Sequence, residues 1–424
     1  MPGGRRSALL ATALFATACS GCNNGNGASP DGSTDTGTET DTDTGSDTGS
    51  ETDTSTWVSD AGPWEWEDNP PGEDCGPGCK QLTFTNKVKA GWWDVWGDYL
   101  VYCPDGPGER DHFYLVDVAN DKRMKIPTIY SGSATNVVVS PTIYETTLYY
   151  STGIFEDSTT RQLVRVDFEE KTQTILYSES SSALQDFQAL NYLDAYGDQV
   201  VSQAGCGTEA PHGYSLCLFD VSTVPAEVHT IIDEDYGNYT SLWDGVVVFK
   251  YAKEGFDVVG YDIAAQQFIT ITDDEYCQFF PMINGRKVVY GDTRFGTAQD
   301  CVMGNHNHEA VFTYDLDTQE RTQITNAQWI ADQPDIWNEI IIWMDYRDCG
   351  NPNDVSSLSN VQIWGYNLET QAEFKITNLP ADASPDRPKA TPRIWGYKVY
   401  VDMPTISPDT YNSIFVFDLP EGAR

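Results

Sequence analysis

Positive charge is scarce in this sequence. Its 424 residues contain 25 Lys and Arg against 64 Asp and Glu, which gives a formal net charge of −39 at pH 7. Phosphate backbones and anionic lipid headgroups recruit clusters of Lys and Arg, so this balance argues against nucleic acid or anionic lipid as a partner. Cationic ligands, divalent metals and neutral sugars remain open.

The short motifs of common enzyme classes are also missing. The chain contains no nucleophile elbow, phosphate loop, dinucleotide fingerprint or zinc-protease helix, and it has only five histidines. Long helical patterns are lacking too. Residues 73–424 are instead rich in Tyr, Trp, Val, Ile and Thr, which predicts an all-β domain. One β domain of this length is expected to be a barrel or a propeller.

The N-terminus predicts export. Arg5 and Arg6 precede an apolar run from Ala8 to Ala18, and Cys19 follows. The run is too short to cross a bilayer as a mature helix. "ATAC" resembles a bacterial lipoprotein processing site, which implies that residues 1–18 are a lipoprotein signal peptide and that Cys19 is the lipidated first residue. Ala16 stands where such sites usually have Leu, and an ordinary cleaved signal peptide is the alternative.

The next segment has a different composition. "SPDGSTDTGTETDTDTGSDTGSETDTST" contains only Asp, Glu, Ser, Thr, Gly and one Pro, so it cannot bury a core. Residues 19–72 are therefore predicted to be a disordered acidic linker that lifts the folded domain off a membrane. Export into an oxidising compartment suits the eight cysteines beyond Cys22. Cys75 and Cys79 can close a small loop, Cys206 with Cys217 can tie a longer one, and the remaining connectivity stays open.

An apolar-Asp-apolar step recurs along the folded part. It occurs seven times, at intervals of 42 to 53 residues, and Asn replaces Asp once. The copies centre on Asp117, Asp167, Asp220, Asp262, Asp315, Asn367 and Asp418. A tight turn and a β-rich run precede each copy, as in "WGDYLVY" from Trp96 and "WNEIIIW" from Trp337. Each unit is thus predicted to contain four antiparallel strands.

Seven such units predict a seven-bladed β-propeller of four-stranded antiparallel blades. The seventh copy stops at "FDLPEGAR" with no room for an outer strand. "KQLTFTN", residues 80–86, looks like the outer strands "RTQITN" and "FKITN" but stands ahead of the first copy. We therefore expect an N-terminal strand to complete the last blade and close the ring, which also removes open sheet edges.

Two units carry a family resemblance. "INGRKVVYGDTR" and "IWNEIIIWMDYRD", each followed by a "YDL" or "YNL" step, resemble the repeats of TolB-like β-propellers in bacterial envelope and cell-surface proteins. The resemblance covers about residue 81 to the C-terminus, although the second, third and fourth copies lack the Asp-x-Arg step. It implies a propeller at the cell envelope and leaves the function open, because propellers host binding modules, scaffolds and enzymes.

The loops predict where a ligand binds. The connections between the second and third strands are long in most units and emerge on one face, and those of the fifth and sixth units span about 292–310 and 345–360. Four of the five histidines fall in them: His112, His212, His306 and His308. His306, His308 and Glu309 in "DCVMGNHNHEAV" are candidate ligands for Zn²⁺ or Mn²⁺. Loop histidines with no ligand are the alternative.

Two Asp-x-Arg steps lie at the ends of second strands. "GDTR" contains Asp292 and Arg294, and "MDYRD" contains Asp345 and Arg347. Residues two apart share one face of a strand, so each pair is predicted either to bond across a blade boundary or to face a ligand. The recurrent tryptophans at the turns, such as Trp96 and Trp337, are most simply inter-blade packing.

Two functions follow from these features. The first is a lipid-anchored, non-catalytic envelope propeller, exported to the bacterial outer membrane, monomeric, and binding an envelope protein or glycan. The alternative is a polysaccharide lyase in which His306 or His308 holds a divalent metal or takes the α-proton, while Arg294 or Arg347 neutralises a sugar carboxylate. No cofactor is indicated with certainty, and a divalent metal is the candidate. Convergence of the loop histidines would favour the enzyme.

Overall fold

The computed structural model describes most of the chain beyond residue 63. The described residues are 56–57, 64–72, 74–84, 89–105, 112–129, 136–154, 160–180, 191–203, 215–232, 237–251, 256–296, 308–326, 328–349, 360–378, 392–404 and 412–424. They contain 30 strands and one short 3-10 helix, η1 (Glu421–Ala423). In these ranges no helix has both the length and the apolar character needed to cross a membrane.

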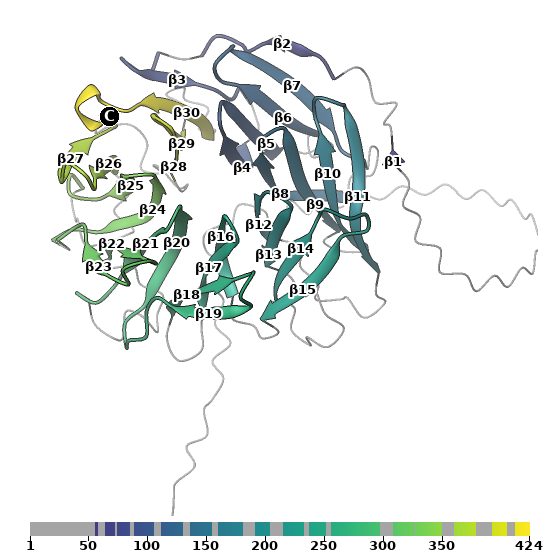
Figure 1. The fold of residues 1–424 in the computed structure, drawn as a ribbon. Helices are drawn as coiled ribbons and strands as arrows, with labels where there is room; N and C mark the ends of the chain where they lie inside the picture. The colour runs from purple at the N-terminus through teal and green to yellow at the C-terminus, as the bar shows by residue number, and fades with distance from the viewer. Residues whose placement is uncertain are drawn as a thin grey trace, which may run out of the picture. The chain divides into compact units, whose positions relative to one another are not determined.

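The strands form seven antiparallel sheets arranged around one axis (Figure 1). Blade 1 contains β4 (Lys89–Trp96), β5 (Tyr99–Asp105), β6 (His112–Asp117) and β7 (Lys122–Pro127). Blade 2 contains β8 (Asn136–Tyr144), β9 (Thr147–Ile154), β10 (Thr160–Asp167) and β11 (Thr172–Ser180). Blade 3 contains β12 (Asn191–Tyr196), β13 (Gln199–Gln203), β14 (Leu216–Asp220) and β15 (Glu227–Ile232). Blade 4 contains β16 (Gly237–Trp243), β17 (Val246–Tyr251), β18 (Asp257–Asp262) and β19 (Gln267–Thr270).

The remaining blades follow the same plan. Blade 5 contains β20 (Gln278–Asn284), β21 (Lys287–Asp292), β22 (Ala310–Asp315) and β23 (Arg321–Gln323). Blade 6 contains β24 (Ala331–Trp337), β25 (Ile340–Asp345), β26 (Gln362–Asn367) and β27 (Ala372–Lys375). Blade 7 contains β28 (Arg393–Trp395), β29 (Lys398–Pro404), β30 (Asn412–Asp418) and β3 (Cys79–Gln81). The predicted seven-bladed propeller is confirmed, and we call the strands of each blade a, b, c and d from the axis outward.

The N-terminal strand closes the ring as predicted. β3 pairs antiparallel with β30, with Gln81 opposite Phe415. The pairing continues beyond the strand, because Leu82 N donates to Ile414 O at 2.8 Å and Ile414 N donates to Thr83 Oγ1 at 2.9 Å. The predicted disulfide between Cys75 and Cys79 forms at the start of this segment. Leu82 and Thr83 are fully buried, so the closing strand is part of the core.

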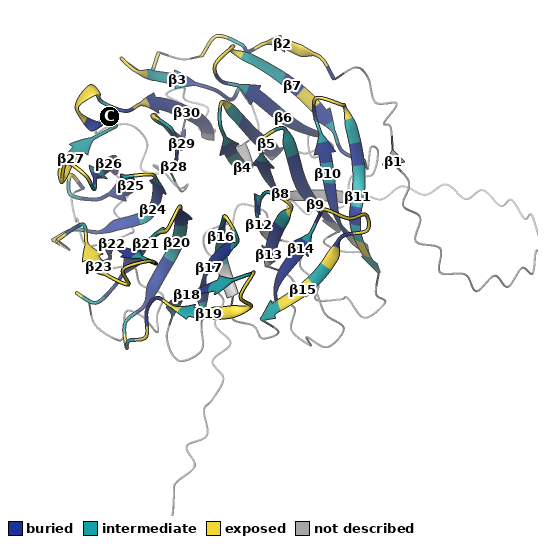
Figure 2. Ribbon diagram, in the orientation of Figure 1, coloured by how far each residue is buried: buried dark blue, intermediate teal, exposed yellow. Residues whose placement is uncertain are grey.

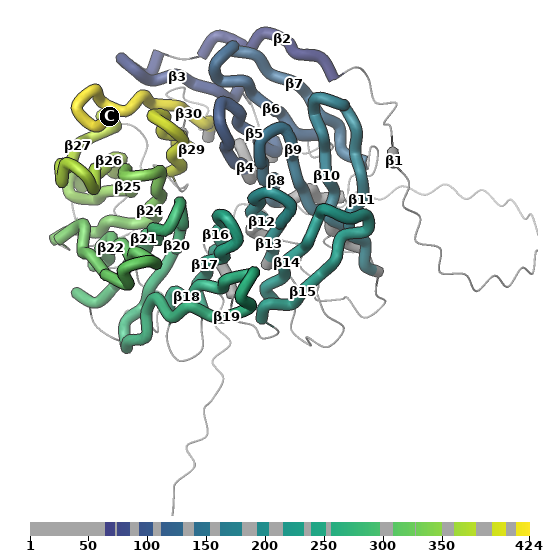
Figure 3. The backbone as a smooth tube through the Cα atoms, viewed as in Figure 1, coloured from purple at the N-terminus to yellow at the C-terminus, as the bar shows by residue number. Residues whose placement is uncertain are grey.

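The folded part begins earlier than the sequence suggested. β1 (Thr56–Trp57) pairs with β11 and β2 (Trp66–Asp68) pairs with β7, so blades 2 and 1 each gain a fifth strand. These two strands lie within residues 19–72, the segment predicted to be a linker. Trp64 explains why this segment is folded, because its side chain is buried in the core between blades 1 and 2 and anchors the segment. Figure 3 shows β2 and β3 outside β7 and β30.

In the first six units the recurrent Asp or Asn caps the turn between strands c and d. Asp315 Oδ1 accepts the backbone N–H groups of Asp317 and Thr318, both at 2.9 Å. Asn367 Oδ1 does the same for Glu369 and Thr370, also at 2.9 Å. An Asx turn needs only a side-chain oxygen, which explains why Asn serves as well as Asp.

Loss of this cap should lower stability measurably. We expect Asp315→Ala to reduce the free energy of unfolding by about 1–2 kcal/mol, because two turn amides lose their acceptor. Urea denaturation measures the change. The matched control is Asp418→Ala, since Asp418 ends the last strand c, has no strand d after it in sequence, and only approaches Lys398 Nζ at 3.5 Å. An equal loss in both variants would contradict the capping role.

The core lies between the blades. Strand b is covered on both sides by neighbouring blades, so consecutive residues are buried instead of alternate ones, as in β17 and β21. β25 is the extreme case, because all six of its residues are buried. Figure 2 shows the same trend, with buried strands near the axis and exposed residues on outer strands such as β15 and β19. The rigid inner strands thereby hold the ends of strand b in fixed positions.

Candidate ligand-binding rim of blades 5 and 6

The two predicted Asp-x-Arg steps form the same structure. Asp292 accepts Arg294 Nε at 3.0 Å on Oδ1 and Arg294 Nη2 at 2.6 Å on Oδ2. Asp345 accepts the corresponding atoms of Arg347, both at 2.7 Å. Both carboxylates are fully buried, whereas the two arginine side chains remain 25% and 18% exposed. We call this pair of clamps, together with its neighbours, the rim of blades 5 and 6.

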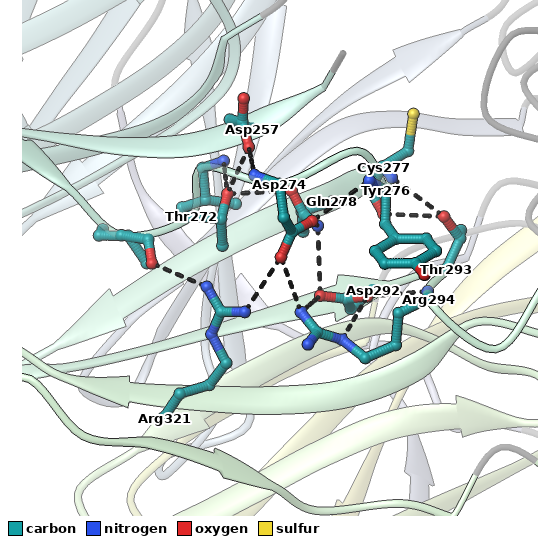
Figure 4. A network of polar contacts seen from close by, with 12 residues as sticks. Asp257, Thr272, Asp274, Tyr276, Cys277, Gln278, Asp292, Thr293, Arg294 and Arg321 are labelled. Atoms are coloured by element: carbon teal, nitrogen blue, oxygen red, sulfur yellow. Dashed lines mark hydrogen bonds and ion pairs between the residues drawn. The ribbon is translucent and has the colours of Figure 1, made fainter. Parts of the chain in front are cut away.

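In blade 5 the clamp belongs to a wider polar network (Figure 4). Asp274, on the crossing from blade 4 to blade 5, accepts Arg294 Nη2 and Arg321 Nη1, each at 3.2 Å. It also accepts Gln278 Nε2 at 2.9 Å. Burial raises the pKa of Asp274, but its hydrogen bonds outweigh burial and leave the pKa below its ordinary value. The network therefore ties two blades together through charged groups.

In blade 6 aromatic rings replace part of that network. The guanidinium of Arg347 lies 4.3 Å from the ring centroid of Trp329 and 3.7 Å from that of Trp364. Arg347 also forms an ion pair with Glu373 through Nη1. The indole N–H of Trp329 donates to Asp345 Oδ2 at 3.0 Å. Arg347 is thus held by two carboxylates and two indole rings.

Arg294 keeps capacity for a ligand. Its Nη1 donates to no acceptor within the described residues, whereas Nη1 of Arg347 contacts Glu373. Phe295 follows directly, is 45% exposed, and stacks on Phe312 with ring centroids 6.3 Å apart. The rim therefore presents a partly exposed guanidinium beside an exposed ring on a rigid support.

Only part of the predicted metal site, His308 and Glu309, lies in the described residues. Glu309 is fully buried and hydrogen-bonded to Asp332, and burial raises its pKa well above the ordinary value. A carboxyl group that holds its proton is a poor ligand, because metal binding requires the ionised form. His308 is described but His306 is not. Across the described ranges, no three His, Cys, Asp or Glu side chains gather as ligands for one metal ion.

Gly291 makes room for this carboxyl group. A Cβ placed on Gly291 would lie 1.6 Å from Glu309 Oε1. We expect Gly291→Ala to lower the free energy of unfolding by about 1–3 kcal/mol, because the buried carboxyl cannot move into open space. Chemical denaturation measures the loss, with Gly260→Ala as the control, where the nearest atom is Ile269 Cβ at 3.2 Å. The double variant Gly291→Ala with Glu309→Ala should recover part of the stability, and no recovery would contradict the clash.

The other predicted site residues are separate from the rim or undescribed. His112 begins β6 in blade 1, is buried, and meets the ring of Tyr114 edge-on at 5.0 Å. His212, His306 and Cys19 lie outside the described residues. The convergence of loop histidines that would favour an enzyme is therefore not tested within the described residues.

The sequence did not reveal that the turn aromatics meet on the axis. The last residue of strand a is aromatic in six blades: Trp96, Tyr144, Tyr196, Trp243, Trp337 and Trp395. Trp395 lies 4.1 Å from Trp96 and 4.0 Å from Trp337, measured between ring centroids. These rings form a plug at the end of the axis opposite the long loops. An aromatic residue before each turn was the sequence signal for this plug. The six rings meet only because the seven blades close into a ring.

A polar ring lies two residues before the plug in each strand a. Its polar members are Asp94, Thr142, Asp194, Ser241, Asp335 and Arg393, and Met282 takes the position in blade 5; all of these except Thr142 line a cavity of about 150 Å³. Asp194 Oδ2 accepts Leu242 N at 2.7 Å and Asp335 Oδ2 accepts Ile394 N at 2.9 Å, so each carboxylate links its blade to the next. Desolvation raises the pKa of Asp194 to about 7 and that of Asp335 to about 6.

Comparison with known proteins agrees with this architecture. No family model and no curated relative matches the sequence. An oligogalacturonate lyase from Vibrio parahaemolyticus and an oligogalacturonate lyase in complex with manganese each align at 13% identity and a TM-score of 0.54, covering 85% of this chain and 98% of theirs. The propeller domain of the trilobed protease from Pyrococcus furiosus aligns at 10% identity and a TM-score of 0.52, covering 79% and 95%. Identities this low show the fold alone, a β-propeller.

Proposed function

We propose that the protein is a non-catalytic binding module of the bacterial cell envelope that takes a glycan on the rim of blades 5 and 6. One observation carries the proposal: two consecutive residues offer a free donor and an exposed ring. Arg294 Nη1 has no acceptor in the described residues, and the ring of Phe295 is exposed. Aromatic faces stack on sugar rings, and a guanidinium donates to sugar oxygens. The net charge of −39 favours a neutral glycan over a polyanion.

The setting of this module follows from the N-terminal sequence. Cys19 would carry a lipid, the acidic segment after it would act as a stalk, and the propeller would face outward as a monomer. This arrangement resembles TolB-like envelope propellers, and in this proposal the module would lie at the outer membrane. An envelope protein is the other partner class, and it would use the same rim.

A polysaccharide lyase is the second candidate. It is favoured by one observation, namely that two of the similar structures are oligogalacturonate lyases, one in complex with manganese. In this chain Arg294 would neutralise a uronate carboxylate, and the loop histidines would supply the base or hold the metal. Arg347 is less suited to that role, because Asp345 and Glu373 already occupy its donors.

One experiment separates the two candidates. The purified full chain is screened on an array of neutral and uronic-acid oligosaccharides, and the same ligands are assayed for unsaturated elimination products with and without Mn²⁺. We expect binding to a neutral glycan without product. Product formation would establish the lyase, whereas absence of any glycan signal would leave the envelope protein as partner and refute the glycan proposal.

Two matched variants locate the binding site. Phe295→Ala should weaken glycan binding about tenfold, since loss of a stacked ring costs roughly 1–1.5 kcal/mol. Phe268→Ala is the control, because Phe268 is 56% exposed but lies on the outer strand β19 of blade 4. Titration calorimetry measures both. Equal weakening in the two variants would exclude the rim as the site.

A further inference from the structure

Lys250 is the one buried lysine in the described part of the chain. It lies near the end of β17 with 8% of its surface exposed. Three rings surround its ammonium group: the Nζ atom lies 4.4 Å from the ring centroid of Phe256, 5.0 Å from that of Tyr239 and 5.3 Å from that of Phe279. Tyr239 belongs to blade 4 and Phe279 to blade 5, so the cage spans the boundary between two blades.

Among the described residues, no carboxylate forms an ion pair with this ammonium group. Desolvation by burial lowers the pKa of Lys250 to about 8. The half-buried lysines behave differently, because each is paired with a carboxylate, as in Lys287 with Glu339 and Lys375 with Asp348. Lys250 is thus alone among the described lysines in combining burial with the lack of an ion pair.

The cage does not supply a structural reason for the charge. Cation–π contacts stabilise an ammonium group less than its burial without an ion pair destabilises it, and an apolar side chain would fill the same space without that cost. A buried group that costs stability and has a perturbed pKa is a candidate for chemistry. Desolvation in an apolar pocket is one of the established ways to activate a lysine amine as a nucleophile.

We propose that Lys250 is a carbonyl-reactive amine that forms an imine with a small aldehyde. The neutral Nζ attacks the carbonyl carbon and forms the C–N bond, and the carbonyl oxygen leaves as water with the two hydrogens of the amine. No oxidant or reductant takes part. The aromatic walls exclude water from the imine and slow its hydrolysis. This activity is independent of glycan binding at the rim, because Lys250 lies in blade 4 and shares no residue with the rim.

Reductive trapping tests the proposal on the full chain. The protein is treated at pH 7 with propanal or with glyceraldehyde in the presence of cyanoborohydride, and peptide mass mapping gives the rate of alkylation at each lysine. At pH 7 about a tenth of the molecules carry a neutral amine at Lys250 if its pKa is about 8. At a lysine with the ordinary pKa, only roughly one molecule in three thousand does. We expect Lys250 to react at least about tenfold faster than the exposed Lys125 and Lys171, allowing for its lower intrinsic nucleophilicity.

The two aldehydes identify the source of the carbonyl. Faster trapping of propanal would assign an apolar aldehyde, and faster trapping of glyceraldehyde would assign a sugar-derived one. The rate at Lys250 should level off above about pH 8, while the rates at Lys125 and Lys171 keep rising. Alkylation of Lys250 at or below the rate of the exposed lysines with both aldehydes would overturn the proposal.

Lys250→Met tests separately whether the ammonium group of Lys250 has a structural role. The variant loses no ion pair, so its melting temperature should be equal to or higher than that of the original chain, and propanal should no longer label the peptide that contains residue 250. A clear drop in melting temperature would show that the ammonium group is needed by the cage for stability, and it would also overturn the proposal.

Discussion

Deleting residues 1–84 should abolish cooperative unfolding of the propeller. The deletion removes β3 and the fully buried Leu82, and it leaves β30 as an open edge in blade 7. Loss of one buried leucine alone costs about 2–5 kcal/mol, and the lost strand pairing adds to it. An open strand edge also invites self-association. Size-exclusion chromatography and urea denaturation should therefore show aggregates and a broad, early transition.

The matched control removes residues 1–54, which keeps β1, β2 and β3. It should unfold at the same urea concentration as the full chain, because the deleted part lies outside the described strands. A peptide of residues 74–88 added to the larger deletion should restore the sharp transition if β3 binds as a separate element. An unchanged transition after deletion of residues 1–84 would refute closure by β3.

The architecture was predictable because it rests on local signals that repeat. The Asp or Asn of each unit sits at a turn that needs a side-chain oxygen, and the closing strand resembled other strands d in sequence. β1 and β2 were missed because they belong to no repeat. A two-residue or three-residue strand on an outer edge carries too few residues for a pattern, and Trp64 alone marked the start of the fold.

The candidate site was predictable only in part. The spacing of Asp292 and Arg294 correctly placed both side chains together, but it did not show that the pair bonds within itself. Glu309 was grouped with His308 because they are adjacent in sequence. Its environment is set by Gly291 and Asp332, which lie on neighbouring strands and have no sequence link to it. Such contacts between strands depend on register, which a single sequence does not state.

The polar ring around the axis should make the propeller more stable at mildly acidic pH than at alkaline pH. Asp194 has a pKa of about 7 in the folded chain and an ordinary value of 3.8. Between these values the folded state binds more protons than the unfolded state, so the stability falls as the pH rises through this window. The free energy of unfolding should fall by at most about 1.4 kcal/mol per pH unit, which adds up to several kcal/mol between about pH 4 and 7. Asp335 acts in the same direction up to about pH 6.

The neighbours of Asp194 limit how far this effect goes. The charge of Asp94 raises its pKa further, whereas Arg393 and the backbone amide of Leu242 lower it. Because Arg393 also lowers the pKa of Asp94 and Asp335, one guanidinium serves three carboxyl groups. Full ionisation of the ring would leave more negative than positive charge in a small cavity. At neutral pH a proton within the ring therefore stabilises the contact between blades.

Asp194→Asn separates this effect from the charge of the whole chain. Asn keeps an oxygen that accepts Leu242 N, loses the oxygen that accepts Ala195 N, and cannot ionise, so the stability of the variant should fall less than that of the original chain between pH 5 and 8. The net charge of −39 also weakens the fold as pH rises, but that repulsion is nearly the same in both proteins and cancels in their difference. Melting curves across this range measure the difference.

Asp220→Asn is the control, since hydrogen bonds to Ser222 lower the pKa of Asp220 and any effect should appear only in acid. Parallel curves for Asp194→Asn and the original chain would mean that Asp194 does not hold the proton.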